Sequence, residues 1–270
     1  MKQLNWYQIF GEEDIPDGKT VLPTDDVLIW QKCGGVKTKY ATLSDVLADT
    51  VTLLTLINSS NAIDYLVRST TFATTVCANA NAMVDIGLNN YAANTLLADS
   101  TWRPALCHST YFESVLNYKV PKMTSNNTPT GYARANAVYD SAADYQPWKA
   151  FDQNSSSWWL SARDSTSGWI RFDFPEPIRL YRTMIFPAYS QGIGVSGFIV
   201  QGSNNASTFN NIYSDTIPNS SSYARNNYFD TVADTEYGIL RLNVTSSYSY
   251  GTSKHAVRLV ELQFYGRRDV

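Results

Sequence analysis

The ten-residue stretch VRLVELQFYG, from Val257 to Gly266, decides the fold class of this chain. Apolar residues alternate along it with charged or polar ones, which is the pattern of a β-strand with one buried face. Three earlier segments share its aromatic and apolar character: AFDQN at 150–154 (followed by Trp159), WIRFDF at 169–174 and FIVQGSN at 198–204. These segments predict β-strands, and Trp159, Trp169, Phe172 and Phe174, which lie at or beside alternating strand positions, are expected in the core.

In their order and spacing these four segments resemble the discoidin-like, or coagulation-factor type C, domain. The resemblance covers roughly residues 120–268. It implies an all-β jelly-roll of the galactose-binding-like fold and a domain that binds glycans, lipids or proteins and performs no catalysis. We therefore expect a binding protein.

Composition and charge are those of an ordinary soluble protein with room for about two domains: 270 residues, 44% hydrophobic and 17% charged. The net charge is −3, with 7 Lys/Arg against 12 Asp/Glu in residues 1–117 and 14 against 12 in residues 118–270. Neither part concentrates the basic charge that a phosphate backbone needs, so no nucleic-acid partner is expected. No run of 18 apolar residues is present, so no membrane insertion is expected either.

Three parts follow one another along the chain, which predicts a multidomain fold. Residues 1–40 are an irregular anchor segment punctuated by Pro and Gly, residues 41–117 are helical in pattern, and residues 118–270 form the jelly-roll. The start of the chain lacks the apolar core of a signal peptide, and the three cysteines are few and odd in number. Both features favour synthesis in a reducing cytoplasm.

The helical part contains a repeat in which Ser/Thr-Thr-aromatic is followed one turn later by an aliphatic residue, at 70–76, 100–106 and 109–115. Each unit predicts a short helix with a hydroxyl N-cap, and Cys77 and Cys107 occupy equivalent positions as small core residues. Alanine-rich contact positions and polar residues favour symmetric association over a free-standing bundle. Residues 41–57, which include Leu54 and Ile57, are expected to form a parallel seam in a homotrimer.

The segments PTDDVLIW, SNAIDYLVRST, YAANTLLADSTW and VPKMTSNNTPTG look like those of virion fibre or adhesin proteins of gut bacteriophages. This resemblance implies a virion location, docking of the N-terminal segment on other virion proteins, and a jelly-roll that adsorbs to bacterial surface glycan. Two alternatives are a purely structural capsid or tail cementing protein and the binding module of a cell-associated lectin.

A calcium site is implied by the discoidin-like resemblance. Asp152, Asn154 and Ser157 fall on its ligand positions, and Glu261 falls on the final-strand glutamate. All four are oxygen donors, which suit calcium. Gln153 stands where the family has a glycine that often takes positive φ, a conformation costly for Gln. The alternative is that Asp152 caps a turn and Glu261 pairs with an arginine.

Ligand binding is expected in loops at one end of the barrel, where aromatic faces can stack on sugar rings and polar groups can satisfy their hydroxyls. Trp158 is expected to point outward because its neighbour Trp159 points into the core. The candidate residues are Trp148, Trp158, Arg163, Tyr189, Tyr248, Tyr250 and His255. No catalytic motif is present and only two histidines occur, so no enzymatic activity is expected.

Overall fold

The computed structural model describes residues 70–188, 193–218, 221–248 and 256–268, together with the backbone of strands β1 (Ile29–Cys33) and β2 (Val36–Ala41). The chain divides into two compact units, residues 1–117 and 118–269. β1 and β2 pair antiparallel, so part of the segment expected to be irregular is a small sheet. The rest of the anchor segment, and all of the predicted 41–57 seam after Ala41, lie outside the described residues, and the expectations about them remain predictions.

The first unit contains a succession of short helices: α5 (Thr70–Cys77), α6 (Ala80–Leu88), α7 (Asn90–Ala98), α8 (Trp102–His108) and α9 (Phe112–Val115). Helices this short are marginal alone, so their stability depends on burial of their apolar faces against one another. Trp102, Phe112 and Met83 are completely buried between them. Cys77 and Cys107 are buried thiols, as the repeat predicted. None of the described helices is long and apolar enough to span a bilayer.

At α8 the expected hydroxyl cap is absent, and α6 and α7, which lie outside the three repeat units, are capped by asparagine. Asn79 and Asn89 accept hydrogen bonds from the N–H groups of Ala82 and Ala92, both at 3.0 Å, and so cap α6 and α7. At α8, Thr101 makes no side-chain cap bond. The cap is instead the carboxylate of Asp99, which accepts from the N–H groups of Thr101 and Trp102 and which the positive end of the helix dipole also favours.

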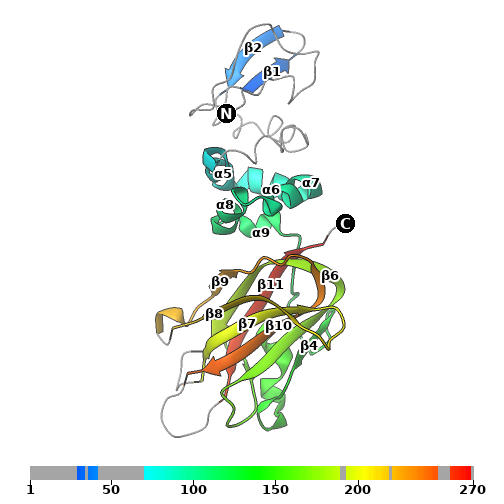
Figure 1. Cartoon of the computed structure of the whole chain (residues 1–270), viewed down its shortest axis with the longest axis vertical. Helices are drawn as coiled ribbons and strands as arrows, with labels where there is room; N and C mark the ends of the chain where they lie inside the picture. The colour runs from blue at the N-terminus through cyan, green and yellow to red at the C-terminus, as the bar shows by residue number, and fades with distance from the viewer. Residues whose placement is uncertain are drawn as a thin grey trace. The chain divides into compact units, whose positions relative to one another are not determined.

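The second unit is a β-sandwich, which confirms the predicted fold of the C-terminal domain (Figure 1). Its strands are β3 (Tyr118–Lys119), β4 (Tyr132–Ala135), β5 (Trp159–Leu160), β6 (Gly168–Pro187), β7 (Val195–Ser203), β8 (Asn210–Thr216), β9 (Asn227–Asp230), β10 (Glu236–Ser247) and β11 (Arg258–Arg267).

Strand β6 takes part in both layers of the sandwich. Its first part, residues 168–173, pairs with β4 and β10, and β10 continues the layer through β7 to the edge strand β8. Its second part, residues 179–187, pairs with β11, and β9 pairs with residues 182–185 on the other side. The exposed segment Pro175–Pro177 separates the two parts, since proline cannot donate to a ladder. The sheet therefore folds over on itself at β6.

The core between the layers contains Trp159, Phe172 and Phe174, as the sequence predicted. The expectation for Trp169 was wrong. It lies on the half-buried outer face of β6, where the guanidinium groups of Arg171 and Arg241 lie 5.5 and 5.8 Å from its ring. Strict alternation along β6 places residues 170, 172 and 174 inside and therefore residue 169 outside.

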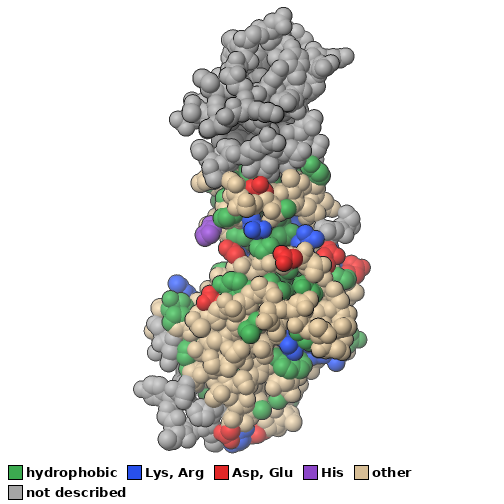
Figure 2. All heavy atoms as spheres, viewed as in Figure 1, with side chains coloured by type: hydrophobic (Ala, Val, Ile, Leu, Met, Phe, Trp, Pro, Cys, Tyr) green, Lys and Arg blue, Asp and Glu red, His purple; other side chains and the backbone are tan. Residues whose placement is uncertain are grey.

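Strand β11 is buried on both faces, although its pattern predicted only one buried face. Leu262 and Phe264 point into the core as expected. The opposite face carries Glu261 and Gln263, and the loop around Gln153 covers it. On the face seen in Figure 2, charged side chains of the described residues occur in small scattered groups without a continuous basic patch.

Candidate functional site

A row of contacting aromatic and arginine side chains lies on the connections around β5 and the start of β11. We call this row the ridge; its members are Arg163, Tyr139, Tyr145, Trp158 and Arg258. The Arg163 guanidinium lies 4.7 Å from the Tyr139 ring centroid, and Tyr139 meets Tyr145 edge to face at 5.9 Å. Tyr145 stacks with Trp158 at 6.3 Å, and the Arg258 guanidinium lies 3.5 Å from the Trp158 ring. Five side chains from four separate segments thus form one continuous surface.

Two charged groups fix the ends of the ridge. Arg163 forms an ion pair with Asp140, which raises the pKa of the arginine, and its Nε donates to Asp140 Oδ1 at 3.2 Å. Arg258 is half-buried, and desolvation lowers its pKa. Its Nε is buried and has no hydrogen-bond partner within the described residues. Both ends therefore present guanidinium groups held by contacts with aromatic rings.

The local fold explains why the ridge forms. Trp159 is fully buried, and its Nε1–H donates to the Ala137 carbonyl at 3.1 Å, which anchors the segment just before Tyr139. Asp140 and Ser141 follow in the short turn η2 (Tyr139–Ser141) with φ of 48° and 53°. Two consecutive non-glycine residues in the left-handed region are costly, and such strain occurs preferentially at functional sites.

The predicted calcium ligands lie at a second place, where the loop after η4 (Pro147–Phe151) meets β11. Asp152 and Glu261 are both buried, each 6% exposed. Asp152 Oδ2 accepts from the Ser157 hydroxyl at 2.6 Å. Gln153 has φ of 53°, so it adopts the left-handed conformation despite its side chain, and its N–H donates to Glu261 Oε2 at 3.0 Å. The loop thus takes the conformation that a glycine would favour.

This carboxylate pair has the electrostatics of a cation site. Burial, and secondly the charge of Asp152, raise the pKa of Glu261 to about 8. Neither carboxylate forms an ion pair within the described part of the chain, so the arginine partner considered for Glu261 is not observed there. Asp152 does cap a turn, because its Oδ1 accepts from the Asn154 N–H at 3.0 Å.

The oxygen donors of Asp152, Ser157 and Glu261 therefore fit a calcium ion, which would neutralise two buried like charges. Asn154 fits less well. Its amide oxygen accepts from the Ser156 N–H at 3.0 Å, and the residue is exposed. Among the described residues no group of three or more His, Cys, Asp and Glu side chains is placed to bind a metal. A calcium ion here would thus depend on hydroxyl and backbone oxygens as well as on the two carboxylates.

The other predicted ligand-binding residues are distributed differently. Trp148 packs against the hydrophobic core, and the Lys149 ammonium lies 5.0 Å from its ring. Tyr248 donates its hydroxyl hydrogen to the Ile217 carbonyl, and burial raises its pKa to about 12. The structure thus brings Trp158 and Arg163 together and places Trp148 and Tyr248 in other contacts. Tyr189, Tyr250 and His255 lie outside the described residues.

The candidate residues named from the sequence do not include Tyr139, Tyr145 and Arg258 of the ridge, nor Asp140, the ion-pair partner of Arg163. The Tyr-Asp pair precedes a run rich in small residues and could have been recognised as a turn with an exposed aromatic ring. Arg258 belongs to the very strand that decides the fold. In the sequence this residue stands out only as a polar position of the alternating pattern.

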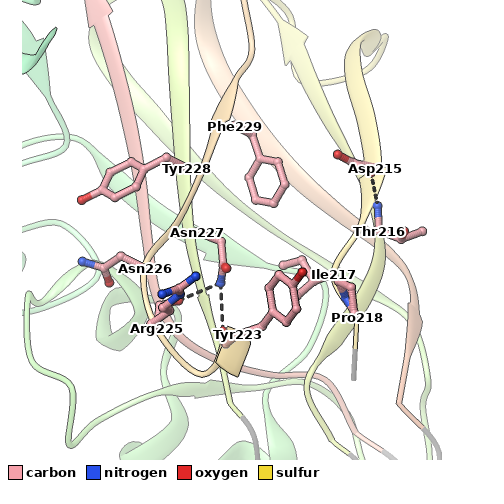
Figure 3. A pocket seen from close by; sticks show the side chains of 10 residues that line it. All are labelled: Asp215, Thr216, Ile217, Pro218, Tyr223, Arg225, Asn226, Asn227, Tyr228 and Phe229. Carbon is pink, nitrogen blue, oxygen red and sulfur yellow. Dashed lines mark hydrogen bonds between the residues drawn. The ribbon is translucent and has the colours of Figure 1, made fainter. Parts of the chain in front are cut away.

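A pocket of about 560 Å³ lies between the ends of β8 and β9. Figure 3 shows the rings of Tyr223 and Phe229 between the two segments, with Asp215 and Thr216 on one side and Asn226 and Tyr228 on the other. Ile217, Pro218, Arg225 and Asn227 complete the lining. No member of the ridge contributes to it.

A two-layer sandwich with a loop surface of aromatic and arginine residues belongs to the class of β-sandwich binding domains. Residues 133–261 match the family model of the F5/8 type C domain. This part of the chain is therefore an F5/8 type C, or discoidin-like, domain, and the resemblance inferred from the sequence is confirmed. No curated protein matches the chain.

Solved structures similar to this chain include chitosan-binding module 1 of a chitosanase/glucanase from Paenibacillus sp. IK-5, with 20% identity, 53% of this chain and 96% of that chain covered, and a TM-score of 0.40. The domain CpGH89CBM32-5 of Clostridium perfringens, solved with GalNAc-β-1,3-galactose, is 12% identical over 55% of this chain and 100% of its own, with a TM-score of 0.43. The family 32 module of C. perfringens NanJ, solved with galactose, is 12% identical over 50% of this chain and 93% of its own, with a TM-score of 0.41.

Proposed function

We propose that the F5/8 type C domain binds glycans, and that the ridge is its binding surface. The observation that carries the proposal is the continuous contact from Arg163 through Tyr139, Tyr145 and Trp158 to Arg258. Aromatic faces offer an apolar surface to the C–H groups of a pyranose ring, while arginine donates several hydrogen bonds to its hydroxyls. The two guanidinium groups lie at opposite ends of the aromatic row, so hydroxyls on both ends of a short saccharide can be bound.

Replacement of Trp158 by alanine is expected to weaken glycan binding by at least about tenfold, because it removes the central ring and the surface on which Arg258 rests. A glycan array that includes bacterial capsular sugars would identify a ligand. Calorimetry with the full chain would then measure its affinity. Trp169→Ala is the matched control, since Trp169 is also half-buried and contacts two arginines, but lies outside the ridge. Equal affinity of wild type and Trp158→Ala would overturn the assignment.

Binding without catalysis is part of this proposal, and calcium has a supporting role in it. A calcium ion held by Asp152, Ser157 and Glu261 would fix the loop after η4 against β11 by neutralising both carboxylates. The same loop leads directly to Trp158, so its order determines where the central ring of the ridge lies. The residues hold and orient the loop; no reaction step is assigned to them.

For the whole chain we propose a structural protein of a phage virion that displays this domain for adsorption to host surface glycan. The support is the resemblance of four separate segments to fibre or adhesin proteins. Many copies on one particle make even weak single sites effective, because binding of the first raises the effective concentration of the rest. The alternatives are a purely structural cementing protein and a cell-associated lectin module. Immunogold labelling of purified virions tests the virion location, and the glycan array tests glycan binding. The two results together separate the three functions.

The homotrimer is proposed on the same basis, with its seam at 41–57. The double substitution Leu54→Asp/Ile57→Asp is expected to release monomers, because it places charges in the apolar contact. Light scattering gives the mass of wild type and variant, and circular dichroism verifies that the F5/8 type C domain stays folded. A wild-type mass other than that of three chains, or an unchanged mass in the variant, contradicts this prediction.

A further inference from the structure

The pocket between β8 and β9 lies where two edge strands from different layers of the sandwich meet. β8 ends the layer that contains β7 and β10, and β9 ends the layer that contains β11. Phe229 of β9 packs edge to face on Phe198 of β7 at 4.9 Å and thereby joins the two layers beside the pocket. The pocket volume, about 560 Å³, is within the range of small-molecule sites.

The pocket wall formed by residues 223–227 is held by one amide group. Asn227 Nδ2 donates to the carbonyls of Arg225 at 2.7 Å, Tyr223 at 2.9 Å and Ile185 at 3.2 Å. The bonds to Arg225 and Tyr223, drawn in Figure 3, hold the turn, and the bond to Ile185 ties it to strand β6. A site held in place before the ligand arrives loses less entropy on binding.

The lining contains two charged residues, Asp215 and Arg225, and they differ in whether their charged groups already have hydrogen-bond partners. Asp215 Oδ2 accepts from the Tyr213 hydroxyl at 2.7 Å, and its Oδ1 accepts from the Thr216 N–H at 2.7 Å. Arg225 is exposed, and its guanidinium forms no ion pair or hydrogen bond with any described residue. The charge available to a ligand is therefore positive, and it lies next to the aromatic wall of Tyr223 and Phe229.

We propose that this pocket is a second carbohydrate site and that it takes an acidic sugar unit. Arg225 binds the sugar carboxylate, for which the planar guanidinium provides two parallel hydrogen bonds. Tyr223 offers an aromatic surface to the ring, and the exposed Asn226 amide is available to its hydroxyls. The pocket lining and the ridge share no residue, so this proposal is tested independently of glycan binding at the ridge.

The test uses the full chain and two monosaccharides that differ only at C6, D-galacturonate and D-galactose. Binding is followed by saturation-transfer NMR and calorimetry. We expect galacturonate to bind at least about tenfold more tightly than galactose, and Arg225→Gln to remove that preference. Asp215→Asn should strengthen galacturonate binding, because it removes a negative charge from the lining without changing the shape of the side chain.

Arg134→Gln is the control and should leave the galacturonate preference unchanged, since Arg134 is an exposed arginine outside both the ridge and the pocket lining. Tryptophan fluorescence distinguishes the two sites when the wild type is compared with Trp158→Phe, because Trp158 is the centre of the ridge, the pocket lining contains no tryptophan, and the chain has six others. The proposal is overturned if galacturonate does not bind saturably, if galactose binds equally well, or if Arg225→Gln keeps the preference. A failure of glycan binding at the ridge instead appears as unchanged Trp158 fluorescence with every neutral glycan.

Discussion

Substitution of Trp159 by alanine is expected to lower the free energy of unfolding of the F5/8 type C domain by about 4 kcal/mol. The side chain is fully buried in the core, and Phe172 and Leu259 belong to the same cluster. Its removal would leave a large cavity and an unpaired Ala137 carbonyl, because the indole Nε1–H is the donor to that oxygen at 3.1 Å. Urea denaturation of the full chain, followed by fluorescence, measures the loss.

The variant Trp159→Phe separates the two contributions. It retains most of the buried ring but lacks the donor, so we expect a smaller loss of about 1–2 kcal/mol together with weaker glycan binding, since the segment before Tyr139 loses its anchor. If Trp159→Ala had the same free energy of unfolding as the wild type, the packing of Trp159 would not be what holds the ridge segment.

The β-sandwich was predictable because its strands carry a two-residue period that reports burial directly. The inward positions of β11, Leu262 and Phe264, follow from that period alone. Burial of the other face does not, because it depends on a loop about a hundred residues earlier in the chain that covers Glu261. Trp169 illustrates a related limit. Its size suggested the core, but its register on β6 places it outside.

The ridge was predictable only in part. Trp158 could be singled out because it follows from the inward direction of Trp159, a relation between neighbours in sequence. Its contacts with Tyr145 and Arg258 join segments that lie 13 and 100 residues apart, and no local pattern encodes them. The helix caps show the same division. Asp99 is an ordinary capping type, but the repeat favoured the hydroxyls of Ser100 and Thr101 beside it.

The stability of the calcium-free protein is expected to fall as the pH rises from about 4.5 to about 8. In the folded chain burial and the charge of Asp152 raise the pKa of Glu261 to about 8, whereas in the unfolded chain this pKa is near 4.5. Between these two pH values Glu261 keeps a proton in the folded chain that it has lost in the unfolded chain. Its contribution to the free energy of unfolding is therefore complete below pH 4.5 and lost above pH 8. At about 1.4 kcal/mol for each pKa unit, the total loss is about 5 kcal/mol.

Calcium should reverse this loss, because a divalent cation favours the ionised forms of Asp152 and Glu261 and binds only the folded loop. Thermal unfolding of the full chain would be recorded from pH 4.5 to 8.5 with a chelator and with excess calcium. Glu261→Gln should flatten the pH dependence in chelator and abolish the stabilisation by calcium, whereas Asp234→Asn, which changes an exposed carboxylate, should do neither. A wild-type curve in chelator that rises with pH would mean that Glu261 is ionised in the folded protein. Stabilisation by calcium that survives Glu261→Gln would place the ion elsewhere, because Glu261 is the ligand proposed on β11, opposite the loop of Asp152.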